Sequence, residues 1–215
     1  GDIDNGPWEW GGTMDFHRIR QDAETGDLFV EPTEAEAAYC SRKAELTGET
    51  VFAGNVTTEK EKAVLKTDQS ELAALLYDLP KTSGAFAVRA ELEYSSEQEF
   101  GIALHTDEGM EQGYFLRICP SQHLMAWDMW PRKEQGMYQW QIDGDIPYQI
   151  ETSRYIPKAE KYELLLIKEG DICVVYLNGK TALSTRLYDH KGGKAGIYIT
   201  QDEIKIQKLE FLTAE

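Results

Sequence analysis

The feature that most constrains the fold is an alternation of apolar and polar residues with a period of two. It is clear in "AFAVRAELEY" at 85–94, and seven later segments continue the pattern. These segments are 100–106, 113–120, 123–130, 161–170, 171–180, 194–200 and 204–212. Short turn sequences such as "TDEG", "KEGD" and "KGGK" separate them. Many short strands at this spacing predict an all-β sandwich or barrel of antiparallel sheets.

Two turns are predicted with particular clarity. "EGD" at 169–171 joins two apolar runs, and "NG" at 178–179 is the strongest short-range hairpin signal in the chain. Helical signals are few. Residues 32–46 form either a short helix, with Thr33 as its cap, or an irregular connector. Residues 68–80 have helical composition, but in a chain rich in strands we favour a strand for "ELAALLYDL".

The start of the chain stands apart from the alternating pattern. "TMDFHRIR" and "GDLFVEP" flank "QDAETG", which predicts a hairpin with a long loop. We therefore divide the chain into a leading hairpin and connector at 1–47 and a sandwich at 48–215. The chain begins with Gly1, so we expect a piece of a longer protein, with Trp8 and Trp10 at a junction to a preceding domain.

The acidic composition excludes several classes of partner. The formal net charge of the 215 residues is −16, which disfavours nucleic acids and anionic membrane surfaces. A neutral ligand such as a carbohydrate is compatible with this charge. Cys40, Cys119 and Cys173 cannot all pair within one chain, and we expect Cys119 and Cys173 to pack as small apolar side chains. The residues leave open whether the protein is exported or cytoplasmic.

Motifs for catalysis, metals and cofactors are absent. The four histidines are scattered singly, and no G-x-S-x-G or H-E-x-x-H pattern occurs. We therefore predict no catalytic residue, no metal ligand and no cofactor. The alternative is a lectin/glucanase-type glycoside hydrolase that uses Glu91 or Glu99, because Glu91 and Glu93, like Glu97 and Glu99, have the spacing that shares a strand face.

Aromatic and polar side chains are concentrated between residues 124 and 155. This segment holds three tryptophans and three tyrosines among carboxylates, an arginine pair and amides. An aromatic surface with a few polar anchors is typical of a small-molecule pocket, and sugar rings stack on aromatic planes. We expect Trp127 in the core, whereas Trp130, Tyr138 and Trp140 adjoin loop-like sequences and are expected to be exposed.

Several segments resemble one known family. "CVVYLNGK", "ALSTRLYD" and "GGKAGIYI" in 173–199 are similar to the C-terminal β-sandwich module of glycoside hydrolase family 32, the levanases, inulinases and invertases. "PWEWGGTMDFHRIR" at 7–20 resembles the stretch that closes the catalytic β-propeller of that family, and 113–132 resembles its sandwich strands. Val174 stands where the family usually has Glu, so the chain resembles a divergent member of that family.

The resemblance implies a concanavalin A-like, jelly-roll sandwich of the lectin/glucanase type, without the catalytic propeller. The family's nucleophilic Asp, Arg-Asp-Pro and Glu-Cys motifs do not occur. We predict a non-catalytic module that binds carbohydrate, with fructan or another neutral sugar as ligand and an upstream catalytic domain as partner. A structural brace for that domain is the alternative. The predicted sugar-binding residues are Trp130, Trp140, Tyr138, Asp128, Arg117, His105 and Glu99.

Overall fold

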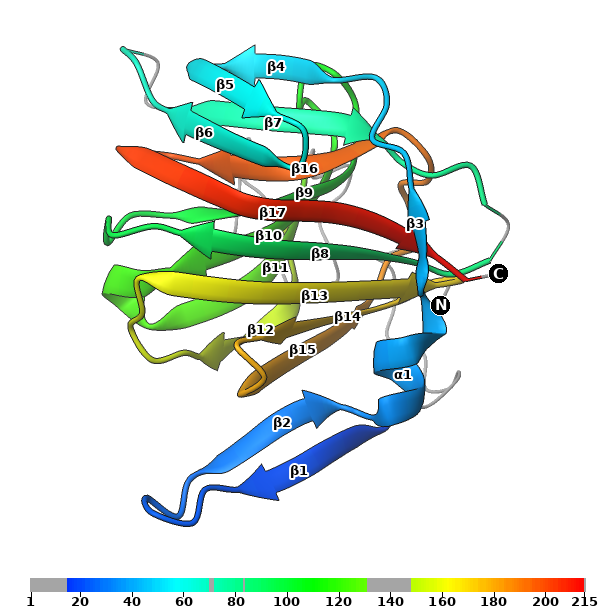
Figure 1. Cartoon of the computed structure of the whole chain (residues 1–215), viewed down its shortest axis with the longest axis vertical. Helices are drawn as coiled ribbons and strands as arrows, with labels where there is room; N and C mark the ends of the chain where they lie inside the picture. Colours follow the sequence, from blue (N-terminus) through cyan, green and yellow to red (C-terminus); the bar gives the residue numbers. More distant parts are fainter. Residues whose placement is uncertain (1–14, 70–71, 83, 131–147, 215) are drawn as a thin grey trace.

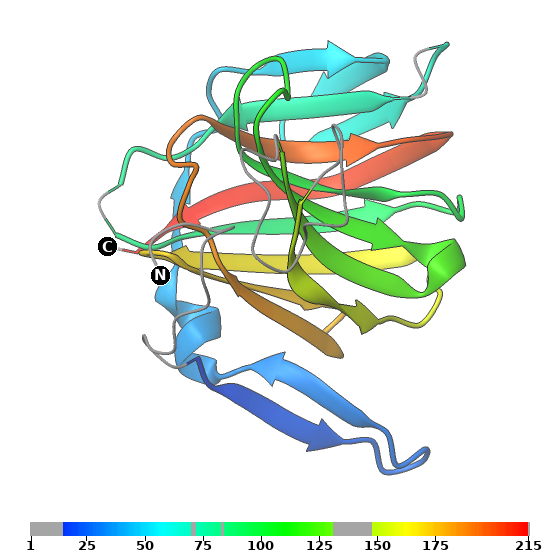
Figure 2. The same cartoon turned by 180° about the vertical axis from the view of Figure 1, so that it is seen from behind.

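Two antiparallel β-sheets packed face to face make up most of the structure, a computed structural model that describes residues 15–69, 72–82, 84–130 and 148–214 (Figure 1). The all-β sandwich expected from the alternation is confirmed. The seven-stranded sheet has the order β12 (Tyr148–Tyr155), β11 (Leu124–Trp130), β10 (Gly113–Cys119), β9 (Phe100–Thr106), β16 (Lys194–Ile199), β7 (Ala73–Asp78) and β4 (Thr50–Ala53). Figure 2 shows this sheet from behind.

The second sheet has eight strands, one of them off the main path. Its order is β15 (Thr181–Arg186), β14 (Ile172–Leu177), β13 (Lys161–Glu169), β8 (Phe86–Glu93), β17 (Glu203–Thr213), β6 (Lys62–Lys66) and β5 (Asn55–Glu59). A short strand, β3 (Arg42–Ala44), also pairs with β17. Residues 42–44 of the leading segment therefore belong to the hydrogen-bonded sheet.

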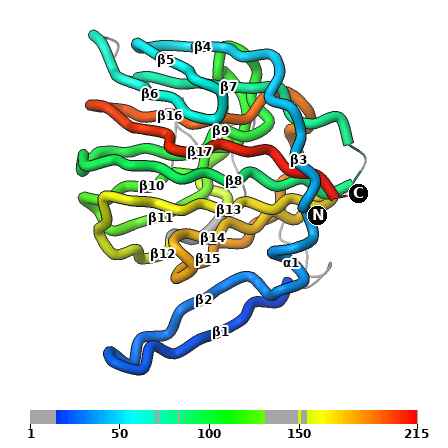
Figure 3. The backbone as a smooth tube through the Cα atoms, viewed as in Figure 1, coloured from blue at the N-terminus to red at the C-terminus, as the bar shows by residue number. Residues whose placement is uncertain are grey.

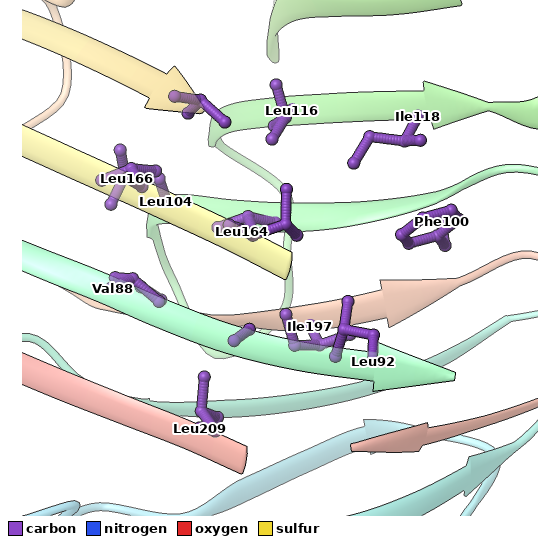
Figure 4. Close-up of a cluster of buried hydrophobic side chains, with 14 of the residues drawn as sticks. Val88, Leu92, Phe100, Leu104, Leu116, Ile118, Leu164, Leu166, Ile197 and Leu209 are labelled. Carbon is purple, nitrogen blue, oxygen red and sulfur yellow. The ribbon is translucent and has the colours of Figure 1, made fainter. Parts of the chain in front are cut away.

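The core lies between the two sheets. Along the central strands, alternate side chains point into it, as the period of two requires. Figure 4 shows side chains from both sheets meeting there: Val88, Leu92, Leu164, Leu166 and Leu209 from one, and Phe100, Leu104, Leu116, Ile118 and Ile197 from the other. Trp127 is completely buried in the same cluster, as predicted.

The local predictions for turns and strands are confirmed. The chain turns between β13 and β14 at Gly170, and between β14 and β15 at Asn178 and Gly179. Asn178 and Gly179 have φ values of 53° and 55°, which asparagine and glycine adopt more readily than other residues. The favoured strand at "ELAALLYDL" is β7.

A hairpin and a short helix precede the sandwich. Strands β1 (His17–Gln21) and β2 (Leu28–Pro32) form a separate two-stranded sheet that projects from one side of the sandwich (Figure 1). Helix α1 (Glu34–Tyr39) follows, and Thr33 and Glu36 cap it reciprocally. Figure 3 follows the chain from α1 through β3 to β4 at the opposite side of the sandwich. No helix in the described ranges is long and apolar enough to span a bilayer.

Candidate functional site on the seven-stranded sheet

Several of the predicted sugar-binding residues form a polar cluster on the outer face of the seven-stranded sheet. Along β10, Tyr114 and Leu116 point into the core, so Phe115 and Arg117 lie on the outer face. On β11, Trp127 is a core residue, which leaves Asp128 and Trp130 for the outer face. Alternation along neighbouring strands thus delivers polar and aromatic side chains to one surface.

Arg117 joins two carboxylates on this face. Its Nε donates to Glu99 Oε2 at 2.8 Å, and its Nη1 donates to Asp128 Oδ2 at 2.9 Å. Glu99 directly precedes β9, and Asp128 lies in β11, on either side of the strand that carries Arg117. The three groups span adjacent strands, so the sheet itself fixes their spacing.

Tyr198 completes the polar cluster from β16. Its hydroxyl donates to Glu99 Oε1 at 3.0 Å and lies 3.3 Å from the Leu116 carbonyl. Gly101 is the cross-strand partner of both Arg117 and Tyr198. A Cβ at Gly101 would lie 1.7 Å from the Leu116 carbonyl oxygen and 3.1 Å from the Tyr198 ring. Glycine is therefore required for this close strand approach.

Burial and charge set the protonation of the cluster. Burial disfavours the charged form of Arg117, but its bonds to Glu99 and Asp128 outweigh this and raise the pKa of the guanidinium. Burial raises the pKa of Asp128, and Arg117 only partly opposes the rise. Burial and the charge of Glu99 raise the pKa of the Cys119 thiol to about 12. At neutral pH the site therefore offers a charged guanidinium as donor and a neutral Cys119 thiol, beside the carboxyl groups of Glu99 and Asp128.

The cluster is partly open to solvent. The Arg117 and Glu99 side chains are 34% and 23% exposed, while that of Asp128 is 4% exposed. A ligand can therefore reach the Arg117 guanidinium and the Glu99 carboxylate, while the buried Asp128 carboxylate fixes the position of the guanidinium. Trp130 is half-buried, two positions beyond Asp128 on the same strand face. Arg117 occupies the space between the two carboxylates, so the cluster does not suit a metal ion.

Four of the seven predicted site residues are brought to this face, namely Glu99, Arg117, Asp128 and Trp130. Tyr138 and Trp140 lie outside the described residues, as do Trp8 and Trp10 of the expected junction. Glu91 and Glu93, the other carboxylate pair, lie on β8 in the opposite sheet. Glu91 and Glu93 share the less buried face of that strand, as their spacing predicted, but they lie on the other sheet from Glu99.

The structure does not bring His105 to the cluster. By alternation from Ala103 it should share the outer face, but β9 is irregular here, and Thr106 and Leu104 pair with consecutive residues of β16. His105 itself has a φ of 54°. This bulge turns the imidazole towards Phe86 and Tyr114 at the end of the core, and His105 Nδ1 lies 2.8 Å from the Gly192 carbonyl.

Two further residues of this face were not predicted. Tyr198 bonds to Glu99, and Phe115 lies edge-on to the Tyr198 ring with centroids 6.0 Å apart. The signal for Tyr198 was present in "KAGIYIT", where Ile197 and Ile199 face the core and Tyr198 must face outwards. The remaining information, that β16 lies next to β9, comes only from the topology.

Fold and site together define a two-sheet antiparallel sandwich with a carboxylate–arginine cluster on one outer face. Among solved structures, the chain is similar to the carbohydrate-binding module CBM66 from Bacillus subtilis, with a TM-score of 0.60 and 14% identity over 80% of this chain and 100% of that one. It is also similar to the exo-inulinase from Aspergillus awamori, with a TM-score of 0.55 and 10% identity over 93% of this chain. A fructosyltransferase from A. japonicus gives a TM-score of 0.50 and 18% identity over 87% of this chain.

These likenesses are likenesses of fold, because the identities are low. The matched region makes up 34% of the exo-inulinase and 29% of the fructosyltransferase, so the chain corresponds to part of those longer proteins. No protein-family profile matches the chain, and no curated protein sequence matches it. The resemblance inferred from sequence is supported at the level of the sandwich fold.

Proposed function

We propose that this chain is a non-catalytic carbohydrate-binding module of a glycoside hydrolase family 32-like protein, with a fructan as its ligand. The observation that carries the proposal is the Glu99–Arg117–Asp128 cluster beside Trp130 on the outer face of the seven-stranded sheet. The fold shared with a carbohydrate-binding module and with part of an exo-inulinase supports the same reading.

The chemistry of the cluster suits a neutral polyol. Arg117 has five N–H donors, of which Nε and Nη1 are used by the two carboxylates, so donors remain for hydroxyl oxygens. Glu99 accepts from Tyr198 and Arg117 and keeps further lone pairs for sugar hydroxyl protons. The indole of Trp130 supplies an apolar plane for the C–H face of a ring.

The arrangement of the carboxylates supports a binding role over hydrolysis. Glycosidases hold an acid and a second carboxylate on opposite sides of the scissile bond, with the anomeric carbon between them. Here the guanidinium of Arg117 lies between Glu99 and Asp128 and bonds to both. A sugar can dock on this cluster but cannot insert its reacting carbon between the two carboxylates.

The leading hairpin is the proposed contact to a catalytic domain in the parent protein. Phe16, Ile19 and Leu28 expose 66%, 67% and 66% of their surface on this hairpin. Large apolar side chains at this exposure typically mark a surface that another protein part covers. The hairpin would then act as the structural brace, while the sugar would bind on the seven-stranded sheet.

The sugar proposal is tested by calorimetry with fructose, levan and inulin on the wild-type chain and on Arg117→Ala. Each hydrogen bond to a charged group contributes about 1.5–3 kcal/mol, so we expect Arg117→Ala to weaken binding roughly 10- to 150-fold. Trp130→Ala should also weaken it. Arg89→Ala is the matched control, because Arg89 has similar exposure and an ion pair to Glu210, but lies on the other sheet.

Saturable binding that Arg117→Ala removes and Arg89→Ala retains would support the proposal. Absence of binding to all three sugars by the folded wild-type chain would contradict it. Release of reducing sugar by the chain, lost in Glu99→Gln, would instead establish the hydrolase alternative.

A further inference from the structure

We propose that Asp15, His17 and Glu36 form a binding site for one divalent transition-metal ion, of the type of Zn²⁺, between the leading hairpin and the sandwich. One ligand atom from each of the three residues lies within 4.8 Å of the other two. The site is on the side of the eight-stranded sheet and does not involve the sugar-binding cluster. It is therefore independent of the proposed function.

Two elements supply the ligands, and the sandwich closes the cluster. Asp15 lies two residues before His17, the first residue of β1. Glu36 comes from the first turn of α1, where its other oxygen caps the helix through Thr33. The outer surface of β14 and β15 closes the cluster with Tyr176 and Ser184.

The hydrogen bonds leave His17 Nε2 directed at Asp15, whose Oδ2 lies 3.7 Å away. His17 Nδ1 lies 2.9 Å from the Tyr176 hydroxyl, and that hydroxyl donates to Glu36 Oε1 at 3.2 Å. With the Tyr176 proton donated to Glu36, Nδ1 would carry the imidazole hydrogen and Nε2 would present a lone pair to a metal ion. Metal-binding histidines are commonly oriented in this way, by a bond from the second ring nitrogen to a neighbouring oxygen.

The cluster has more hydrogen-bond acceptors than donor hydrogens. The Ser184 hydroxyl lies 3.0 Å from Asp15 Oδ2 and 3.2 Å from His17 Nε2, but its single hydrogen can serve only one of them. Asp15 and Glu36 also interact directly with each other. Two carboxylates in contact repel unless a proton or a cation lies between them. A bound cation would satisfy both carboxylates and the imidazole at once.

The geometry and donor set favour a transition metal. His17 Nε2 and Asp15 Oδ2 are 3.7 Å apart, and ligands about 2.1 Å from a tetrahedral Zn²⁺ lie about 3.4 Å from each other. Small side-chain rotations would therefore close the site. An imidazole nitrogen with two carboxylates suits Zn²⁺ and similar ions, whereas Ca²⁺ and Mg²⁺ prefer oxygen ligands alone. The side chains of His17 and Asp15 are 26% and 20% exposed, which leaves access for the ion and a water ligand.

A serine–histidine–aspartate triad is a poorer explanation of the same residues. In a triad the carboxylate holds the imidazole nitrogen opposite to the one that faces the serine. Here Asp15 and Ser184 both face Nε2, while Tyr176 holds Nδ1. The geometry thus points to ligands converging on one point rather than to a proton relay.

Calorimetric titration of the chelator-treated chain with ZnCl₂ tests the proposal. We expect one Zn²⁺ per chain at this site, a rise in melting temperature on binding, and visible absorption bands when Co²⁺ replaces Zn²⁺. His17→Ala and Glu36→Gln should each weaken the binding at least ~10-fold, since even outer-shell changes cost that much. Glu36→Gln keeps the helix cap, because glutamine also serves in a capping box, so the hairpin stays in place.

Matched controls are His123→Ala and Glu34→Gln. His123 stacks on Tyr155 far along the sequence from the cluster, and Glu34 is an exposed carboxylate in the same helical turn as Glu36. Both variants should bind Zn²⁺ as the wild type does. The proposal is overturned if the wild type binds no Zn²⁺, or if His17→Ala and Glu36→Gln both bind it with unchanged affinity.

Discussion

The imidazole of His105 is held among aromatic rings at the end of the core. Only 7% of its surface is exposed, and burial lowers its pKa from 6.5 to about 4. In the unfolded chain His105 takes up a proton near pH 6.5, whereas in the folded chain it does so only near pH 4. The free energy of unfolding therefore falls across this window, by about 3 kcal/mol from this group at pH 4.

Denaturant unfolding between pH 7 and pH 4 measures this effect. In His105→Asn the contribution should be lost, so the variant should show a smaller decrease of stability with falling pH than the wild type. Asparagine tolerates the positive φ of this position, which limits backbone strain. His123→Asn serves as the control and should keep the wild-type decrease. Equal pH dependence in His105→Asn and wild type would show that folding does not lower the pKa of His105.

At the scale of elements, substitutions at two glycines compare the cost of a steric clash between strands with the cost of backbone strain in a turn. In Gly101→Ala the new Cβ would meet the Leu116 carbonyl oxygen at 1.7 Å, which forces β9 and β10 apart. Gly179 has a φ of 55° but open space around it, so Gly179→Ala costs only backbone strain of about 1–2 kcal/mol. We expect Gly101→Ala to lower the free energy of unfolding by roughly 3 kcal/mol or more.

Chemical denaturation of both variants provides the comparison. Gly101→Ala should also reduce sugar binding, because Gly101 lies between Arg117 and Tyr198 in the sheet. Gly179→Ala lies in the β14–β15 turn of the other sheet and should leave binding unchanged. Equal stability losses in the two variants would contradict the close strand approach at Gly101.

The elements themselves were largely predictable, because their signals are local. Alternation identified the strands β8 to β11, β13, β14, β16 and β17, but not the shorter β3 to β6, nor β12 and β15. "NG" identified the β14–β15 turn. Thr33 was recognised as a helix cap, although the helix proved to be only six residues long. The position of His105 could not be predicted, since a β-bulge reverses alternation without a distinctive sequence signal. Tyr198 was missed because its partner Glu99 is a hundred residues away and meets it only through strand order.

At the scale of the whole molecule, the net charge of −16 determines which ligands can bind and how their affinity depends on salt. Salt screens interactions between charges but hardly affects contacts to a neutral sugar. We expect the affinity for a neutral fructan to change less than about twofold between 50 and 500 mM NaCl. Duplex DNA should not bind even at the lower salt concentration, because binding requires a positive surface. A strong salt dependence of sugar binding, measured by calorimetry, would indicate a charged ligand instead.

The order of the strands within the sheets could not be predicted from the sequence. β16 lies between β9 and β7, and β17 lies between β8 and β6, so late strands are inserted between early ones. Local alternation assigns faces to each strand but contains no information on which distant strand becomes its neighbour. The resemblance at 173–199 supplied the sandwich type, and the structure supplied the pairing that assembles Glu99, Arg117 and Asp128.

The central place of β17 has a consequence for how the protein is made. β17 is the last described strand, yet it joins β8 to β6, and Thr213 lies opposite Phe86. Before β17 has been synthesised, the facing edges of β8 and β6 have no partner, and unpaired edges invite association with other chains. Folding of the eight-stranded sheet must therefore await β17, and its rate is set by contacts of long sequence separation.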